Sequence, residues 1–163
     1  RRLYERVREN AEAWGVTLQE PVSASDEALR RVHCPDYIER VRRGTLSASE
    51  QRRIGFPWSE AMARRARRTV GGTIAALETA LRGDGIAANL AGGTHHAAYD
   101  RGGGYCIFND AVVAARHVQA EGLARRLLIV DLDVHHGNGT AELVAGDDTL
   151  FAFSMHDAKN CPA

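Results

Sequence analysis

The segment 127–139 constrains the fold of this chain more than any other, because an aliphatic run changes within it into metal-ligand residues. Residues 127–130 are Leu-Leu-Ile-Val, which predicts a strand of a parallel sheet that is buried on both faces. Asp131, Asp133 and His135 follow at alternate positions, so their side chains would point the same way in a strand. Two carboxylates and an imidazole are costly to bury alone, and we expect a divalent cation such as zinc to be their partner. The alternative, a solvated strand end, fits poorly with so apolar a run.

Two further apolar runs, at 86–90 and 150–155, predict strands before and after this one in the chain. Asn109 is expected to cap a helix that ends near Gly122, and Thr140 to cap a shorter one. Strands that alternate with helices are typical of a parallel sheet with right-handed crossovers, so we predict an α/β fold. Ligands of such sheets bind at the carboxyl ends of the strands, where the acidic cluster lies.

The first 82 residues carry helical patterns. Apolar residues at helical spacing and polar helix starts predict helices over 1–14, from Ser25, over 35–44, over 48–53 and over 59–82. The pair Gly71-Gly72 lies in the middle of the longest helix and lowers its helix propensity. We therefore predict that another stretch of backbone approaches the helix closely at this point.

Composition limits the partners and the location of the chain. Its 163 residues suffice for one domain with a core. Lys+Arg and Asp+Glu both number 21, so the basic cluster at 64–68 is interpreted as a solvated helix face and no nucleic acid is expected. No apolar run reaches the length of a membrane span, no signal peptide is visible, and the first residue is not Met, so the natural chain is expected to start earlier. Cys34, Cys106 and Cys161 form no disulfide framework, which favours a reducing, cytoplasmic compartment.

A pair of histidines, His95-His96, follows the predicted strand at 86–90 and should lie at the same sheet edge as the acidic cluster. Histidine titrates near neutral pH, so two imidazoles beside a metal suggest general acid–base catalysis. A loop histidine is otherwise often exposed and inert, but Gly92-Gly93 would let the backbone approach a ligand closely. The run at 102–104 is either a flexible glycine loop or the wall of a substrate tunnel, with Tyr105 as an aromatic face.

Four segments of the chain together resemble the zinc-dependent histone deacetylase family, most closely its bacterial and class IV branch. They are 92–97, 104–110, 131–140 and 153–156, and they occur in the order and with the spacing of that family. The resemblance is close over about 50–163 and loose over the helical start. It implies an arginase/deacetylase-type fold, a three-layer α/β/α arrangement with a central parallel sheet, of which residues 1–163 would be a partial domain.

The resemblance also implies zinc-dependent hydrolysis of the amide of an acetylated amine, typically acetyl-lysine in a protein or peptide. A metal-activated water would attack, with a histidine as general base. Asp133 and His135 would be zinc ligands. His95 and His96 would be the tandem pair, with His96 the general base, and Asp131 would accept a hydrogen bond from His95.

Further residues take roles only through this resemblance. Asn138 stands where relatives often have an Asp paired with His96, so His96 should be less basic here. Tyr105 would line the acyl-lysine tunnel, and Gly104 would offer its carbonyl to the substrate. A structural potassium ion would be held by the Ser154 hydroxyl and by main-chain oxygens of Asp131, Asp133, His135 and Met155.

The family takes its third zinc ligand, an Asp, and its oxyanion-stabilising Tyr from later in the chain. Two protein ligands make a weak zinc site, so residues 1–163 alone are expected to be inactive. Two other hypotheses stay open beside the lysine deacetylase. One is hydrolysis of small acetylated amines, such as polyamines, or of longer acyl groups. The other is a non-catalytic interaction module that retains the fold.

Overall fold

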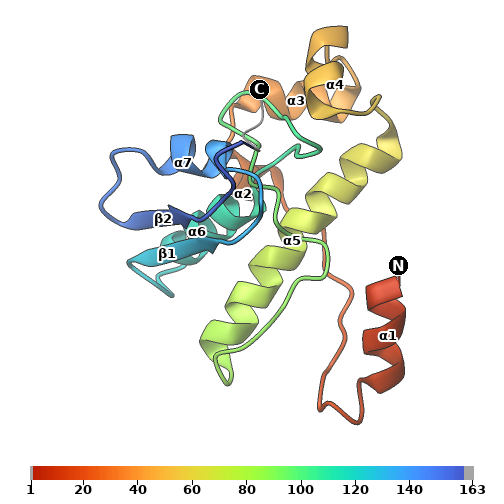
Figure 1. Ribbon diagram of the computed structural model, residues 1–163, viewed down its shortest axis with the longest axis vertical. Helices are drawn as coiled ribbons and strands as arrows, with labels where there is room; N and C mark the ends of the chain where they lie inside the picture. Colours follow the sequence, from red (N-terminus) through yellow and green to blue (C-terminus); the bar gives the residue numbers. More distant parts are fainter. Residues whose placement is uncertain (1, 160–163) are drawn as a thin grey trace.

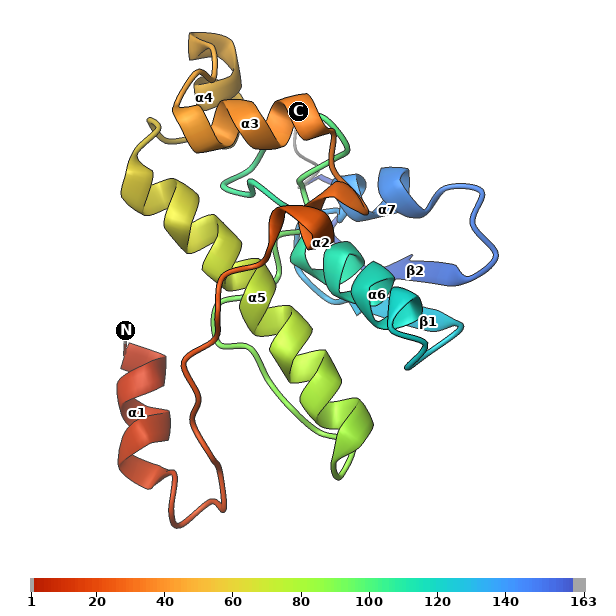
Figure 2. The same cartoon turned by 180° about the vertical axis from the view of Figure 1, so that it is seen from behind.

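The computed structural model describes residues 2–159 (Figure 1). Helices occupy the first two thirds, and two strands with one short helix follow. The elements are α1 Arg2–Asn10, α2 Asp26–Arg30, α3 Pro35–Arg43, α4 Ala48–Ile54, α5 Glu60–Arg82, α6 Asp110–Ala120, β1 Leu127–Asp131, α7 Asn138–Val144 and β2 Leu150–Ser154. Helix α1 buries none of its residues and stands apart from the other helices (Figures 1 and 2). No helix among residues 2–159 combines the length and the apolar character that crossing a membrane requires.

The predicted helix starts are confirmed by their capping hydrogen bonds. The side chains of Ser25, Ser59 and Asn109 each accept a hydrogen bond from the backbone N–H three residues further on. Ser47 does the same for α4 and forms a capping box with Glu50. The prediction that Thr140 caps this helix was wrong by three residues, because the cap is Gly137 and α7 begins at Asn138.

The glycine pair inside α5 lies where another part of the backbone crosses the helix, as predicted. A Cβ atom on Gly71 would collide with the carbonyl oxygen of Val22. The crossing segment is fixed there by a hydrogen bond of 3.0 Å from Ala24 N to Arg67 O. A residue with a side chain at position 71 would force the two segments apart, so the lower helix propensity of glycine is offset by this close packing.

Strands β1 and β2 form a parallel pair in which Leu127 lies opposite Leu150 and Asp131 opposite Ser154. The inward side chains of Ile129 and Ala152 pack against the core that includes α6 and α7. The outward side chains are apolar but exposed, by 59% at Leu128 and 67% at Phe151. The prediction that both faces are buried was therefore wrong for residues 2–159, since their helices cover only one face of this sheet.

The strand predicted at 86–90 does not form. This segment runs back along α5 (Figures 1 and 2), and Asn89 Nδ2 donates to Thr69 O over 2.9 Å. Ile86 is 82% exposed. A strand needs hydrogen-bonded neighbours, and β1 and β2 pair only with each other within the described residues.

His33 is fully buried between the rings of Tyr37 and Phe108. Its Nε2 accepts a hydrogen bond of 3.0 Å from Asn109 N, so Nδ1 carries the ring proton and donates to Ala98 O over 2.8 Å. Burial penalises the charged ring and lowers the pKa of His33 to about 4. The folded protein therefore holds this histidine neutral.

Acid is expected to destabilise the fold through His33. The unfolded chain binds a proton on His33 below about pH 6.5, whereas the folded chain binds it only near pH 4. Stability is therefore lost as the pH falls through this window, by about 3 kcal/mol at pH 4. Urea unfolding between pH 7 and 4 measures the slope, and His33→Gln should flatten it. An equal slope in both proteins would contradict the prediction.

Candidate active site

The predicted ligand residues gather where β1 ends, beside the loop 92–98 and the start of α7. The alternation of Asp131, Asp133 and His135 had predicted that all three lie in one strand. Strand β1 ends at Asp131, however, so Asp133 and His135 lie in the following loop. Each Asp side chain instead forms a turn, by accepting a hydrogen bond from the backbone N–H two residues further on. Asp131 Oδ1 accepts from Asp133 N over 3.0 Å, and Asp133 Oδ1 accepts from His135 N over 2.7 Å. These successive side-chain turns place the side chain of His135 against that of Asp133.

His95 is oriented by Asp131. The Nδ1 atom of His95 lies 2.5 Å from Asp131 Oδ2, and both side chains are largely buried. A carboxylate can only accept here, so Nδ1 donates and Nε2 is left as the basic nitrogen. Gly137 allows this packing, because a Cβ atom on it would collide with the same carboxylate oxygen.

His96 is oriented by Asn138 at the first position of α7. Asn138 Oδ1 lies 2.8 Å from His96 Nδ1, so the ring donates from Nδ1 and again presents Nε2 as the base. The pKa of His96 is lowered, chiefly because burial penalises the charged ring, while the bond to Asn138 opposes this shift. The ring of His96 lies 4.0 Å from that of His95 and 6.0 Å from that of His135, between centroids.

Asp133 and His135 have the donor chemistry of a zinc site but supply only two ligands. His135 Nδ1 lies 2.9 Å from Asp133 Oδ1, and the backbone N–H of His135 is the main cause of the lowered pKa of Asp133. An ionised carboxylate beside an imidazole suits zinc. Within residues 2–159, however, no three His, Cys, Asp or Glu side chains are grouped closely enough to hold a metal ion. Catalytic zinc takes three protein ligands, so this part of the chain supplies an incomplete set.

Of the two predicted substrate residues, Gly104 lies against His96 and Tyr105 lies against Phe56. A Cβ atom on Gly104 would collide with the His96 ring, so only glycine lets the backbone pass so closely. Gly104 N and Tyr105 N donate to Arg53 O and Ile54 O, which fixes this turn against the end of α4. Tyr105 has a φ of 66°, is 69% exposed and stacks on Phe56 with ring centroids 5.9 Å apart. Its ring is thus displayed at the surface over Gly55 and Phe56.

Of the residues predicted to hold potassium, Asp131 and Ser154 line a hollow of about 180 Å³, which Gly137 and His156 also line. The Ser154 hydroxyl accepts from Gly137 N over 3.4 Å and lies 2.9 Å from His156 Nδ1. The carbonyl oxygen of Asp131 accepts a hydrogen bond from Met155 N over 3.0 Å. The hydroxyl and this carbonyl suit a monovalent cation in chemical type, and potassium binding here stays a prediction.

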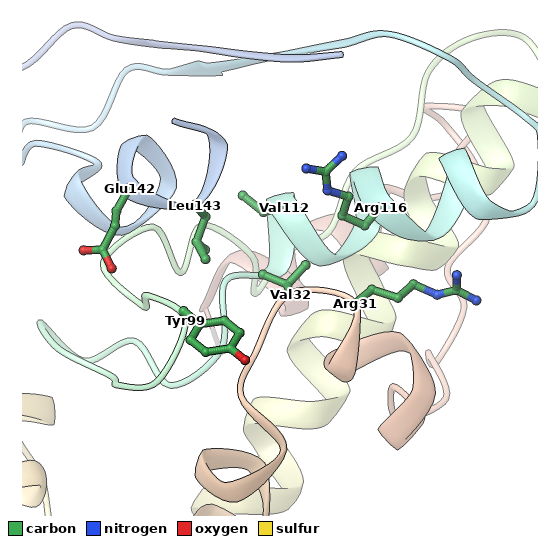
Figure 3. A pocket seen from close by; sticks show the side chains of 7 residues that line it. All are labelled: Arg31, Val32, Tyr99, Val112, Arg116, Glu142 and Leu143. Atoms are coloured by element: carbon green, nitrogen blue, oxygen red, sulfur yellow. The ribbon is translucent and has the colours of Figure 1, made fainter. Parts of the chain in front are cut away.

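Figure 3 shows a larger hollow of about 280 Å³, whose lining includes neither His95 nor His96. Its charged side chains already have partners: Arg31 pairs with Glu27, Arg116 with Asp147 and Glu142 with Arg101. We therefore assign no function to it. It is lined by Arg31, Val32, Tyr99, Val112, Arg116, Glu142 and Leu143.

The sequence did not reveal the roles of three polar residues, Thr94 within the histidine loop and Asp110 and Thr140, which bond to it. Thr94 and Asp110 bond to each other across the loop, and Thr140 N donates to His95 O over 3.0 Å. The available signal was an acidic residue placed directly after the Asn109 cap and before an apolar helix. An acidic residue in the first turn is ordinary at a helix start, so its position in the sequence does not reveal whether Asp110 is exposed or buried.

Comparison with known proteins identifies relatives over most of the chain. The model of the histone deacetylase domain matches residues 1–162. An uncharacterised protein of Picosynechococcus is 51% identical over 135 residues, which are 83% of this chain and 45% of that protein. The acetoin utilization protein AcuC of Bacillus subtilis is 36% identical over 146 residues, 84% of this chain and 38% of AcuC. The chain thus spans less than half the length of these curated relatives.

Solved structures agree with these matches. The crystal structure of a histone deacetylase homologue from Aquifex aeolicus superposes with a TM-score of 0.74 at 31% identity, over 84% of this chain and 39% of that one. The HDA15 HD domain gives a TM-score of 0.70 at 27% identity, over 86% and 40%. These neighbours confirm the deacetylase-type α/β fold implied by the sequence motifs. The chain belongs to the histone deacetylase family.

Proposed function

We propose that the protein carrying this chain hydrolyses the amide of an acetylated amine, with acetyl-lysine in a protein or peptide as its substrate. The observation that supports this most is the orientation of the two histidines. His95 and His96 each give their Nδ1 proton to a fixed acceptor, Asp131 or Asn138, and so each presents a basic Nε2. Asp133 and His135 adjoin this pair, with His95 Nε2 4.0 Å from Asp133 Oδ1.

Asp133 and His135 would hold zinc, with a third ligand from outside residues 2–159. A zinc ion bound there would polarise the amide carbonyl and make water more acidic. His96 Nε2 would take the proton of the attacking water and return it to the departing amine. The lowered pKa of His96 keeps the ring neutral, as a base must be, around neutral pH. His95, whose Nδ1 donates to Asp131, would present its basic Nε2 next to His96.

Turnover by the full natural chain tests this proposal. An acetyl-lysine peptide and an N-acetylated polyamine should be assayed side by side, with and without a chelator. We expect the peptide to be hydrolysed faster, chelation to abolish turnover and added zinc to restore it. Faster hydrolysis of the polyamine would change the substrate class, and a zinc-loaded protein inactive on both would reject the proposal. Residues 1–163 alone should stay near background, because they supply two zinc ligands.

A further inference from the structure

The start of α6 places two neighbouring polar side chains inside the protein, next to the histidine loop. Asn109 is 0% and Asp110 2% exposed. Asp110 is paired with no Arg, Lys or His within residues 2–159, which is unusual for a buried carboxylate. Its surroundings consist of hydrogen-bond donors and the N-terminus of α6, which favours negative charge.

The donors to Asp110 come from the segment just before His95 and from Thr73 on α5. Asp110 Oδ2 accepts from Gly93 N over 3.1 Å and from the Thr73 hydroxyl over 2.5 Å. Asp110 Oδ1 accepts from Thr94 N over 2.7 Å and lies 2.6 Å from the Thr94 hydroxyl. A Cβ atom on Gly92 would lie only 2.7 Å from Asp110 Oδ2. One side of the histidine loop is thereby tied to α6 by both oxygens of one carboxylate.

Asn109 ties the other side of the same loop. Its Nδ2 donates to Ala97 O over 3.3 Å and to the Thr140 hydroxyl over 2.9 Å. Its backbone N–H donates to His33, which in turn donates to Ala98 O. His95 and His96 therefore lie between two anchored segments, Gly93–Thr94 and Ala97–Ala98, and both anchors belong to consecutive residues of one helix start.

We propose that Asn109 and Asp110 are positioning residues that hold the backbone on both sides of His95 and His96 in the geometry that amide hydrolysis needs. This inference rests on the proposed function. Neither residue reaches the reacting atoms, and both act through the loop. A displacement of about 1 Å of a catalytic group can cost about 10²-fold in rate, so an anchor of this kind matters although it is remote from the chemistry.

Asp110→Asn in the full natural chain is the sharpest test, because it keeps the shape of the side chain and replaces one hydrogen-bond-accepting oxygen by a donating NH2 group. An amide presents N–H groups to one of the two donor sets, so either Thr73 and Gly93 or Thr94 lose their acceptor. We expect kcat to fall by about 10–100-fold with little change in KM. Zinc affinity should persist, since Asp133 and His135 are placed by their own turns after β1. Asp148→Asn, at an exposed carboxyl far from the loop, is the matched control.

Amide hydrogen exchange gives a readout that is independent of activity. Exchange at residues 93–97 should rise by at least about tenfold in Asp110→Asn, with the protection of α5 unchanged. Thr94→Val should reproduce both effects, and Thr94→Ser, which keeps the hydroxyl, should restore them. This second pair decides the question if Asp110→Asn does not fold.

Three results would overturn the inference: unchanged exchange at 93–97, exchange raised equally throughout the molecule, or a loss of kcat no larger than in Asp148→Asn. A wild-type chain without amide hydrolysis, but with the localised exchange effect in the variants, would reject the proposed function and support the anchoring of the loop. The two failures are thus distinguishable.

Discussion

His96→Ala is expected to lower kcat for hydrolysis of an acetyl-lysine peptide by about 10²–10⁴-fold, the usual contribution of a general base. The reason lies in the bond from His96 Nδ1 to Asn138 Oδ1, which leaves Nε2 as the proton acceptor. Alanine removes this acceptor and leaves the position of Asp133 and His135 unchanged, since their turns do not involve His96. KM should therefore change little, and steady-state kinetics with one peptide separates the two quantities.

His117→Ala is the matched control for this prediction. His117 lies on α6, pairs with Glu78 over 2.9 Å and contacts none of the tandem histidines in the described contacts. His117→Ala removes the same side-chain atoms as His96→Ala and should leave kcat within a few-fold of wild type, because the half-buried pair with Glu78 lies apart from the tandem histidines. If His96→Ala were as active as His117→Ala, His96 would not be the base, and His95→Ala would be the next variant to assay.

Features encoded by neighbouring residues could be predicted from the sequence. A serine or asparagine cap and an apolar stripe suffice to begin a helix, and α5 and α6 begin where Ser59 and Asn109 indicate. The close approach of another backbone segment to the glycine pair of α5 could also be predicted, because a cost in helix propensity implies a compensating contact. What the pattern could not name was the contact itself, the carbonyl oxygen of Val22 some 50 residues away in the chain.

Features that depend on distant partners could not be predicted. The segment 86–90 has the composition of a strand, but composition does not supply the neighbouring strand that its backbone needs. Strand alternation was predicted to align Asp131, Asp133 and His135, but Asp133 and His135 lie in a loop, where side-chain turns place these two next to each other. The role of Asp110 depends on Thr73 and Thr94, which only the folded chain brings near it.

Asp133→Ala is expected to weaken zinc binding by at least about 100-fold, more than the loss usually seen when only an outer hydrogen-bond partner of a ligand is removed. Two of the three protein ligands that a catalytic zinc needs would come from Asp133 and His135, whose Oδ1 and Nδ1 lie 2.9 Å apart. Removing the carboxylate leaves two of the three ligands in the full natural chain and also ends the turn that places His135, since Asp133 Oδ1 accepts from His135 N. Competition with a chromogenic chelator in the full natural chain measures the affinity.

Two further variants make this titration specific. Asp131→Asn keeps the shape of the group that orients His95, so zinc affinity should fall by at most about 10–100-fold. Asp148→Ala removes an exposed carboxyl at the opposite end of β2 and should leave the affinity unchanged. The expected zinc affinity is therefore highest in Asp148→Ala, lower in Asp131→Asn and lowest in Asp133→Ala. If Asp133→Ala bound zinc as tightly as Asp148→Ala, the metal would lie elsewhere, and the two histidines would have no polarised carbonyl beside them on which to act.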